Sequence, residues 1–140
     1  LAAGAAHAIN SSERRVDEAV KEITGGQGVH CLFDPVGLPP EIALRGLAFG
    51  GRILLIGFAG DIPNYPANRI LMKCATVIGV RAGEYARHFP AVRAEETPHM
   101  EALTKVLRPH VGKAYPLVEA AQALRDIAER RAIGRIVLHP

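Results

Sequence analysis

The feature that most constrains the fold is a run of apolar residues without alternation, Ile53-Leu54-Leu55-Ile56, inside residues 52–58. Successive side chains of a strand point to opposite faces, so a strand with consecutive apolar residues needs cover on both faces. A parallel sheet enclosed by helices provides that cover. Residues 29–33 and 75–80 are also short and apolar and are bounded by turn residues. We therefore predict three buried strands of one parallel sheet.

Helical patterns alternate with these strands, and glycines separate the segments. After Ser11 and Ser12, which are candidate N-caps, the apolar residues share one helical face; they are Val16, Ala19, Val20 and Ile23. Residues 39–48 and 66–73 have the pattern of two further helices. The alternation of helix and strand predicts a doubly wound α/β fold.

The pattern changes after Gly83. Residues 84–100 are polar, and we expect Pro90 and Pro98 to interrupt any helix there. A helix ending at Pro109, an extended segment, an amphipathic helix over about residues 118–131 and a last strand over residues 135–138 follow. We expect the apolar residues of the amphipathic helix to form its inner face; they are Ala120, Ala121, Leu124, Ile127 and Ala128.

Composition excludes several classes of function. The net charge is +3, but basic residues alternate with acidic ones, so no basic stripe for nucleic acid is present. The longest nearly apolar run, residues 53–60, is too short to cross a membrane. Cys31 and Cys74 lie in apolar runs, which favours buried reduced thiols and a cytoplasmic location over a ligand or redox role. The first residue is Leu1, so we expect the chain to be a piece of a longer protein.

The candidate site lies where the three strands end. Ligands of open parallel sheets bind outside the carboxyl ends of the strands. Each end here combines glycine with small side chains: Asp34, Pro35, Val36 and Gly37; Gly57, Phe58, Ala59 and Gly60; Val80, Arg81, Ala82 and Gly83. Glycine permits close approach of a ligand to the backbone, although it also simply ends strands. Asp34 is either a turn former or a partner for a ligand hydroxyl.

Several motifs are missing from the sequence. It has no G-x-G-x-x-G loop, no P-loop and no G-x-S-x-G elbow. The six histidines show no metal-ligand spacing, so we predict no metal site. No catalytic constellation is contained in the chain.

The ordered motifs ITGGQGVHCLFDPVG, LRGLAFGGRILLIGFAG, PANRILMK and YPLVEAAQALRDIAERRAIGRIVL span nearly the whole chain. Together they resemble the quinone oxidoreductase branch of the medium-chain dehydrogenase/reductase superfamily. The resemblance implies an incomplete doubly wound (Rossmann) sheet in residues 1–84. It implies a linker and the C-terminal segment returning to a GroES-like catalytic domain in residues 85–140. The glycine loop would precede Leu1, and residues 6–10 would form the third Rossmann strand.

The resemblance also implies an activity: hydride transfer from NADPH, with NADH as the alternative, to a quinone or an enone-like acceptor, without catalytic zinc. It places Asp34, Pro35, Val36 and Gly37 near the ribose and pyrophosphate. Gly57, Phe58 and Ala59 would lie beside the nicotinamide riboside, and Val80, Arg81 and Ala82 would flank the nicotinamide. Arg135 occupies the position of a family lysine that can reach the cofactor.

A second hypothesis remains open, in which the chain is a non-catalytic α/β ligand-binding or dimerisation module. The strand over residues 75–80 would then pair with the edge of a partner. A homodimer is compatible with both hypotheses. On the first hypothesis, the isolated chain would be inactive, would bind NADPH negligibly and would expose a bare sheet edge at residues 29–33.

Overall fold

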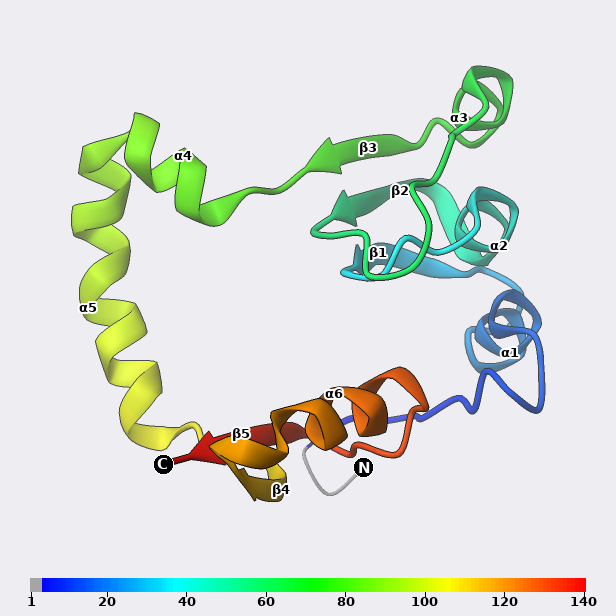
Figure 1. Cartoon of the computed structure of the whole chain (residues 1–140). Coiled ribbons are helices and arrows are strands. Elements are labelled where there is room, and N and C mark those ends of the chain that lie inside the picture. The colour runs from blue at the N-terminus through cyan, green and yellow to red at the C-terminus, as the bar shows by residue number, and fades with distance from the viewer. Residues whose placement is uncertain (1–3) are drawn as a thin grey trace. The chain divides into compact units, whose positions relative to one another are not determined.

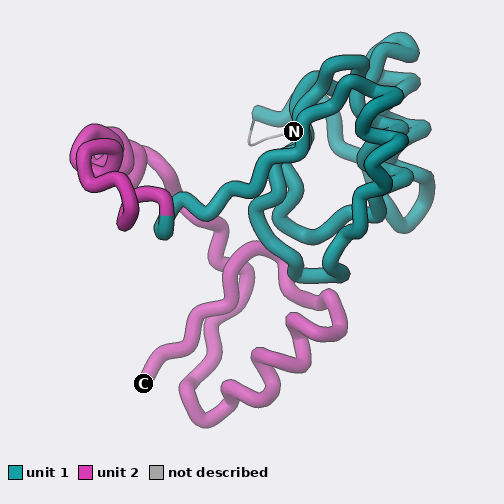
Figure 2. The backbone as a smooth tube through the Cα atoms, turned by 90° about the horizontal axis from the view of Figure 1, so that it is seen from above, with its two compact units in different colours: residues 1–84 teal, residues 85–140 magenta. Residues whose placement is uncertain are grey.

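The computed structural model describes residues 4–140. The chain divides into two compact units, residues 1–84 (unit 1) and residues 85–140 (unit 2), coloured separately in Figure 2. No helix within residues 4–140 is both long enough and apolar enough to span a membrane.

Unit 1 alternates helices and strands (Figure 1). The elements are α1 (Val16–Ile23), β1 (Val29–Asp34), α2 (Pro40–Gly46), β2 (Leu47–Leu55), α3 (Ala67–Lys73) and β3 (Thr76–Gly79). The three strands are parallel and lie in the order β1-β2-β3. This arrangement confirms the predicted α/β class with a parallel sheet.

The core of unit 1 forms on one face of this sheet. Leu32, Ile53 and Val77 lie side by side in the strand register. They pack with residues of α2 and its C-terminus, and the buried members of this cluster are Ala43, Leu44, Leu47 and Ile53. Burial of Leu44, Leu47 and Ile53 contributes about 1.5–3 kcal/mol each.

The opposite face of the sheet is open within unit 1. Phe33, which is 63% exposed, lies there with Cys31 and Ile78. The prediction of cover on both faces is therefore not met in unit 1, because the core lies on the Ile53 face alone. The prediction of buried thiols is wrong: Cys31 is exposed on the open face, and Cys74 is exposed at the end of α3.

Three expected boundaries also differ. Residues 6–10 form no strand, so the predicted third Rossmann strand is absent from the described part of unit 1. Ser11 and Ser12 do not cap α1, which begins at Val16; Asn10 instead accepts a bond from the Ser12 amide at 3.1 Å in a preceding turn. The strand predicted over residues 52–58 begins at Leu47, and the register of β1 against β2 shifts between Val29 and Cys31.

Unit 2 contains the end of α4 (Ala82–His88), followed by α5 (Pro90–Val106), β4 (Val111–Pro116), the single turn η1 (Leu117–Glu119), α6 (Ala120–Ala128) and β5 (Arg135–His139). β4 and β5 form a two-stranded parallel sheet. Pro90 occupies the first turn of α5, where its missing N–H has no consequence. Pro98 lies inside α5 without ending it, so the predicted interruption is wrong.

The inner face of α6 was also predicted wrongly. Ala123 and Asp126 are buried, whereas Leu124 is 67% exposed and Ile127 is 54% exposed. The reason is the carboxylate of Asp126, which binds side chains from β4 and from beyond the end of α6. A polar network therefore decides which side of α6 faces the rest of unit 2.

Candidate functional site

The three predicted turns of unit 1 follow β1, β2 and β3 at the carboxyl edge of the sheet. The Asp34 carbonyl accepts a bond from the amide of Ile56 at 2.9 Å, and the Val36 carbonyl accepts one from the amide of Gly60 at 2.7 Å. The Val80 amide donates to the Leu55 carbonyl at 2.9 Å. Backbone bonds thus join residues 34–37 to residues 56–60, and residues 80–83 begin beside the end of β2.

Asp34 organises the first of these turns. It is 3% exposed, and its Oδ1 accepts hydrogen bonds from the amides of Val36 at 3.0 Å and Gly37 at 2.9 Å. Its Oδ2 accepts the amide of Leu38 at 2.8 Å. Bonds of this kind from successive amides to a carboxylate fix an Asx turn. Asp34 therefore forms the turn, and a role toward a ligand stays a prediction.

Two glycines let the first two turns pack closely. Gly37 has φ +91°, and a Cβ there would collide with the carbonyl oxygen of Asp61. A Cβ on Gly57 would lie 3.1 Å from the Pro35 carbonyl oxygen. These two glycines therefore allow neighbouring backbone segments at this edge to contact one another. At the third turn, a Cβ on Gly79 or Gly83 would meet no atom within 4 Å, so these two glycines leave space at the edge.

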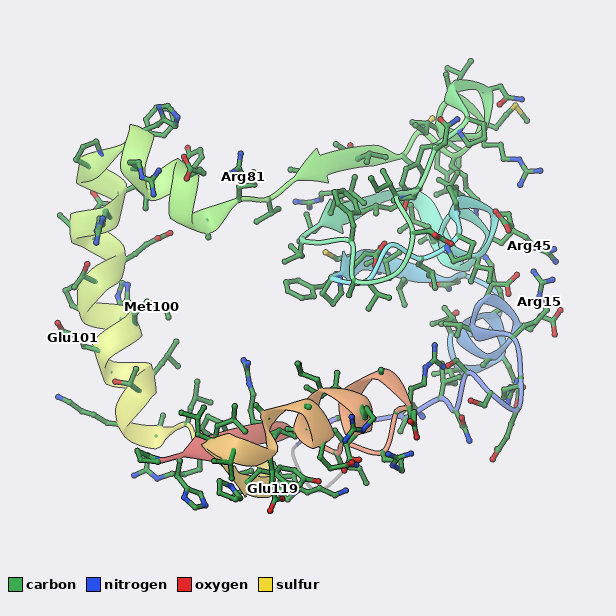
Figure 3. The ribbon with its side chains drawn as sticks, in the orientation of Figure 1. Arg15, Arg45, Arg81, Met100, Glu101 and Glu119 are labelled. Atoms are coloured by element: carbon green, nitrogen blue, oxygen red, sulfur yellow. The ribbon has the colours of Figure 1, made fainter. Side chains whose placement is uncertain are left out.

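The outward-facing side chains at this edge are those of Val36, Phe58 and Arg81. The Arg81 side chain projects from the segment between β3 and α4 (Figure 3) and lies 4.0 Å from Glu84. Pro35, Ala59 and Ala82 complete the predicted residues of unit 1. Arg135 belongs to unit 2, where its amide donates to the His110 carbonyl at 2.8 Å.

Sequence reasoning missed Tyr65. Its ring packs against the core of unit 1, and its hydroxyl is buried without a hydrogen-bond partner among the described residues. Burial, and secondarily the negative charge of Asp34, raise the pKa of Tyr65. A tyrosine between two prolines carries no sequence signal for such a position.

A second charged cluster joins α1 to α2. Asp17 is buried; Arg15 donates to both of its oxygens at 3.1 Å, and Arg45 Nε lies 3.2 Å from Oδ2. The bond from Arg15 lowers the pKa of Asp17, although burial opposes this effect. The charges of this cluster are thus internally compensated.

Unit 2 holds a comparable network around Asp126. Its Oδ2 accepts Lys113 Nζ at 2.5 Å and the Tyr115 hydroxyl at 2.6 Å, and its Oδ1 accepts Arg131 Nη2 at 2.8 Å. The bond from Lys113, followed by those from Tyr115 and Arg131, lowers the pKa of Asp126 far below its ordinary value. The network joins β4 to α6. Over residues 4–140, no three His, Cys, Asp or Glu side chains are grouped to hold a metal ion.

Comparison with known proteins identifies the family. The model of the family described as zinc-binding dehydrogenase matches residues 1–96, more than half of the chain. The chain belongs to this family. Bovine quinone oxidoreductase-like protein 2 (Bos taurus) is 32% identical over 142 residues, covering 99% of the chain and 41% of the relative. The resemblance to the quinone oxidoreductase branch is therefore confirmed.

Solved structures of oxidoreductases also match the chain. A quinone oxidoreductase from Pseudomonas syringae pv. Tomato DC3000 matches with a TM-score of 0.78 at 26% identity, covering 99% of the chain and 44% of that protein. A mycobacterial protein solved in complex with NADPH matches with a TM-score of 0.68 at 29% identity, covering 89% of the chain and 40% of that protein. The chain spans about two fifths of the length of these relatives.

Proposed function

We propose that the chain is part of an NAD(P)H-dependent oxidoreductase that transfers hydride to a quinone or an enone-like acceptor. The observation that carries the proposal is the carboxyl edge of the parallel sheet, where residues 34–37, 57–60 and 80–83 follow β1, β2 and β3, in a member of this dehydrogenase family. The carboxyl edge of a parallel sheet is where such folds bind dinucleotides. The names of its relatives support the acceptor class.

The residues at this edge fit a nicotinamide dinucleotide. Gly79 and Gly83 have open space beside them, and the apolar side chains of Val36 and Phe58 face outward, where a flat ring could pack. When bound, the cofactor supplies the hydride. Asp34 holds the first turn in place, and Phe58 would exclude water from the ring. Arg81 is exposed and adds a positive charge beside the proposed nicotinamide turn. A role of Arg135 toward the cofactor stays a prediction of the family resemblance.

The proposal includes three finer expectations. NADPH is the preferred cofactor, which is supported by the NADPH complex of a relative. Hydride transfer proceeds without catalytic zinc, since this reaction needs none. The chain acts within a longer, two-domain cytoplasmic protein, in which residues 1–84 complete a Rossmann domain and residues 85–140 return to the catalytic domain. The share of the relatives' length that the chain covers supports the last expectation.

The test uses the whole protein that contains these residues. Purified protein should oxidise NADPH in the presence of a quinone, followed by loss of the absorbance of the reduced nicotinamide. Ala59→Glu places a carboxylate at the proposed nicotinamide turn and should raise the KM for NADPH about tenfold or more. Ala67→Glu, on the exposed start of α3, is the matched control and should leave the KM unchanged. No quinone-dependent oxidation, or equal effects of both variants, would contradict the proposal.

The alternative is a non-catalytic module that dimerises through β3. One observation favours it: β3 pairs only with β2 in the described sheet, so its other edge is available. Val77→Pro would not test this cleanly, because Val77 packs against the core. Sedimentation of the 140-residue chain with and without Ile78→Lys is cleaner. Loss of a dimer in that variant, together with no oxidoreductase activity of the whole protein, would favour the alternative.

A further inference from the structure

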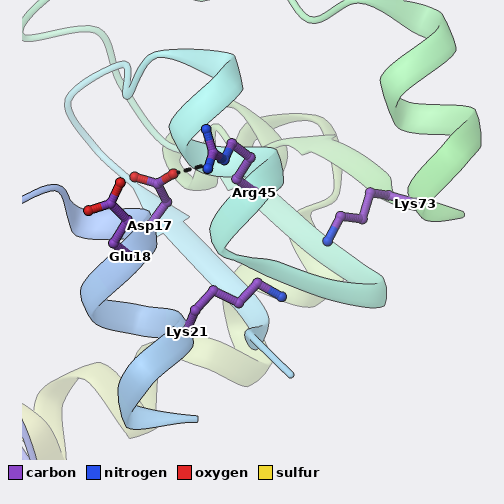
Figure 4. A pocket seen from close by; sticks show the side chains of 5 residues that line it. All are labelled: Asp17, Glu18, Lys21, Arg45 and Lys73. Carbon is purple, nitrogen blue, oxygen red and sulfur yellow. Dashed lines mark ion pairs between the residues drawn. The ribbon is translucent and has the colours of Figure 1, made fainter. Parts of the chain in front are cut away.

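An open pocket of about 520 Å³ lies away from the proposed cofactor edge. Its lining residues are Asp17, Glu18, Lys21, Arg45 and Lys73, shown in Figure 4. Lys21 Nζ donates to the carbonyls of Gly26 at 2.8 Å and Gln27 at 3.2 Å, just before β1 begins. Lys73 Nζ donates to the carbonyl of Leu47, the first residue of β2, at 2.7 Å. The pocket therefore adjoins the amino ends of the strands.

The two acidic residues of the pocket are already compensated. Asp17 is paired with Arg15 and Arg45, and Arg15 Nε also lies 3.4 Å from Glu18. Two carboxylates are thus matched by two guanidinium groups. Lys21 and Lys73 add two further positive charges, and neither has an ion pair with a carboxylate within residues 4–140.

The two ammonium groups point into the same pocket from different helices (Figure 4). An ammonium has three N–H donors. Lys21 uses two of them on carbonyls and Lys73 uses one, so donors remain on both. Burial, and secondarily the charge of Lys21, lower the pKa of Lys73. Two like charges that line one pocket without a carboxylate partner would be stabilised by an anion between them.

We propose that Lys21 and Lys73 form a binding site for a phosphate-class dianion at the amino edge of the sheet. The ligand is either inorganic phosphate or the phosphoryl group of a larger metabolite, because both present the same oxygens to the two ammonium groups. The alternative interpretation is that each lysine only binds backbone carbonyls to secure the chain. This inference does not depend on the proposed hydride transfer, which concerns the opposite edge.

The test is calorimetric titration of the 140-residue chain with inorganic phosphate, against chloride at matched ionic strength. We expect saturable phosphate binding whose Kd rises about tenfold or more in the double variant Lys21→Gln/Lys73→Gln. Lys21→Arg/Lys73→Arg keeps both charges and should retain binding within about fivefold of the unchanged chain. The control Lys105→Gln removes an exposed lysine of α5 and should leave Kd unchanged. Absence of saturable binding, or the same Kd in the double Gln variant, would overturn the proposal.

A second measurement needs no variant and so does not depend on the variants folding. Phosphate should slow modification of Lys21 and Lys73 by an amine-reactive reagent, read by mass spectrometry, while Lys105 reacts at an unchanged rate. Equal protection by inorganic phosphate and by adenosine monophosphate would identify the phosphoryl group as the bound element. Stronger protection by the nucleotide would indicate a larger phosphorylated ligand. Unchanged rates at both pocket lysines with either compound would overturn the proposal.

Discussion

The turn after β1 depends on two residues with different tasks. Asp34 accepts three backbone amides, so its carboxylate replaces the strand partners that those amides lack. Gly37 takes a left-handed conformation in which only a hydrogen fits beneath the Asp61 carbonyl. The turn's shape, and hence the first part of the proposed cofactor edge, follows from these internal contacts.

Gly37→Ala should destabilise unit 1 by about 3 kcal/mol, because it combines the strain of a positive φ with displacement of the Asp61 carbonyl. Gly25→Ala is the matched control. Gly25 has φ +58° with open space around it, so only the conformational cost of about 1 kcal/mol applies. Denaturant unfolding measures both. Equal losses in free energy of unfolding would show that the contact with Asp61 is unimportant.

Acid should destabilise unit 2 through Asp126. The bonds from Lys113, Tyr115 and Arg131 lower its pKa in the folded state, so unfolding takes up a proton once the pH falls below the ordinary carboxyl value of about 4. The stabilisation is present above that value and is lost as the pH falls toward the folded pKa. Asp126→Asn should be less stable at neutral pH and should lose less stability on acidification.

Hydrogen exchange of the β4 amides at a series of pH values reports this effect locally, apart from the titration of Asp17 in unit 1. Glu119→Gln, which changes an exposed carboxyl next to α6, is the control and should keep the full acid dependence. A variant Asp126→Asn with the same acid dependence as the unchanged chain would contradict the assignment.

At the scale of the elements, hydrophobic periodicity and the positions of glycines predicted which helices and strands form better than they predicted which face of each is buried. Strands β1, β2 and β3 were found because apolar runs between glycines have few other solutions in a chain of this kind. The inner face of α6 was predicted wrongly, because the burial of Asp126 depends on partners outside this helix. These partners are Lys113 on β4 and Arg131 beyond the end of α6. Hydrophobic periodicity cannot register a buried charge that is satisfied elsewhere.

Pro98 in α5 gives the clearest test at this scale. Proline has no N–H, so the carbonyl four residues earlier lacks its helical donor, and α5 buries none of its described side chains. Pro98→Ala should raise the free energy of local helix opening by about 3 kcal/mol, seen as slower amide exchange over residues 94–102. His99→Ala controls for general helix propensity and should change exchange far less. Similar effects of the two substitutions would indicate that Pro98 is not the weak point of α5.

At the scale of the whole molecule, the sequence predicted that the three strands end at one edge of a sheet, but it did not predict which face of that sheet stays open. The requirement for two-sided cover came from consecutive apolar residues, and Phe33 now lies exposed on a face without helices in unit 1. The predicted strand over residues 6–10 could not be judged from its residues alone. A strand forms only beside a neighbour, and the described sheet ends at β1. Because the described sheet ends at β1, its carboxyl edge offers a ligand only the ends of β1, β2 and β3.

The 140-residue chain should therefore bind NADPH only negligibly. A doubly wound sheet holds the pyrophosphate at a glycine-rich loop and helix N-terminus, and this sequence contains no G-x-G-x-x-G loop. Titration followed by reduced-nicotinamide fluorescence should show no saturation at micromolar NADPH, with circular dichroism confirming that the chain is folded. Weak binding through the phosphates at Lys21 and Lys73 would disappear in the double Gln variant, which separates the two edges. Micromolar saturation that survives in that variant would mean that residues 34–37, 57–60 and 80–83 bind the cofactor without a glycine loop.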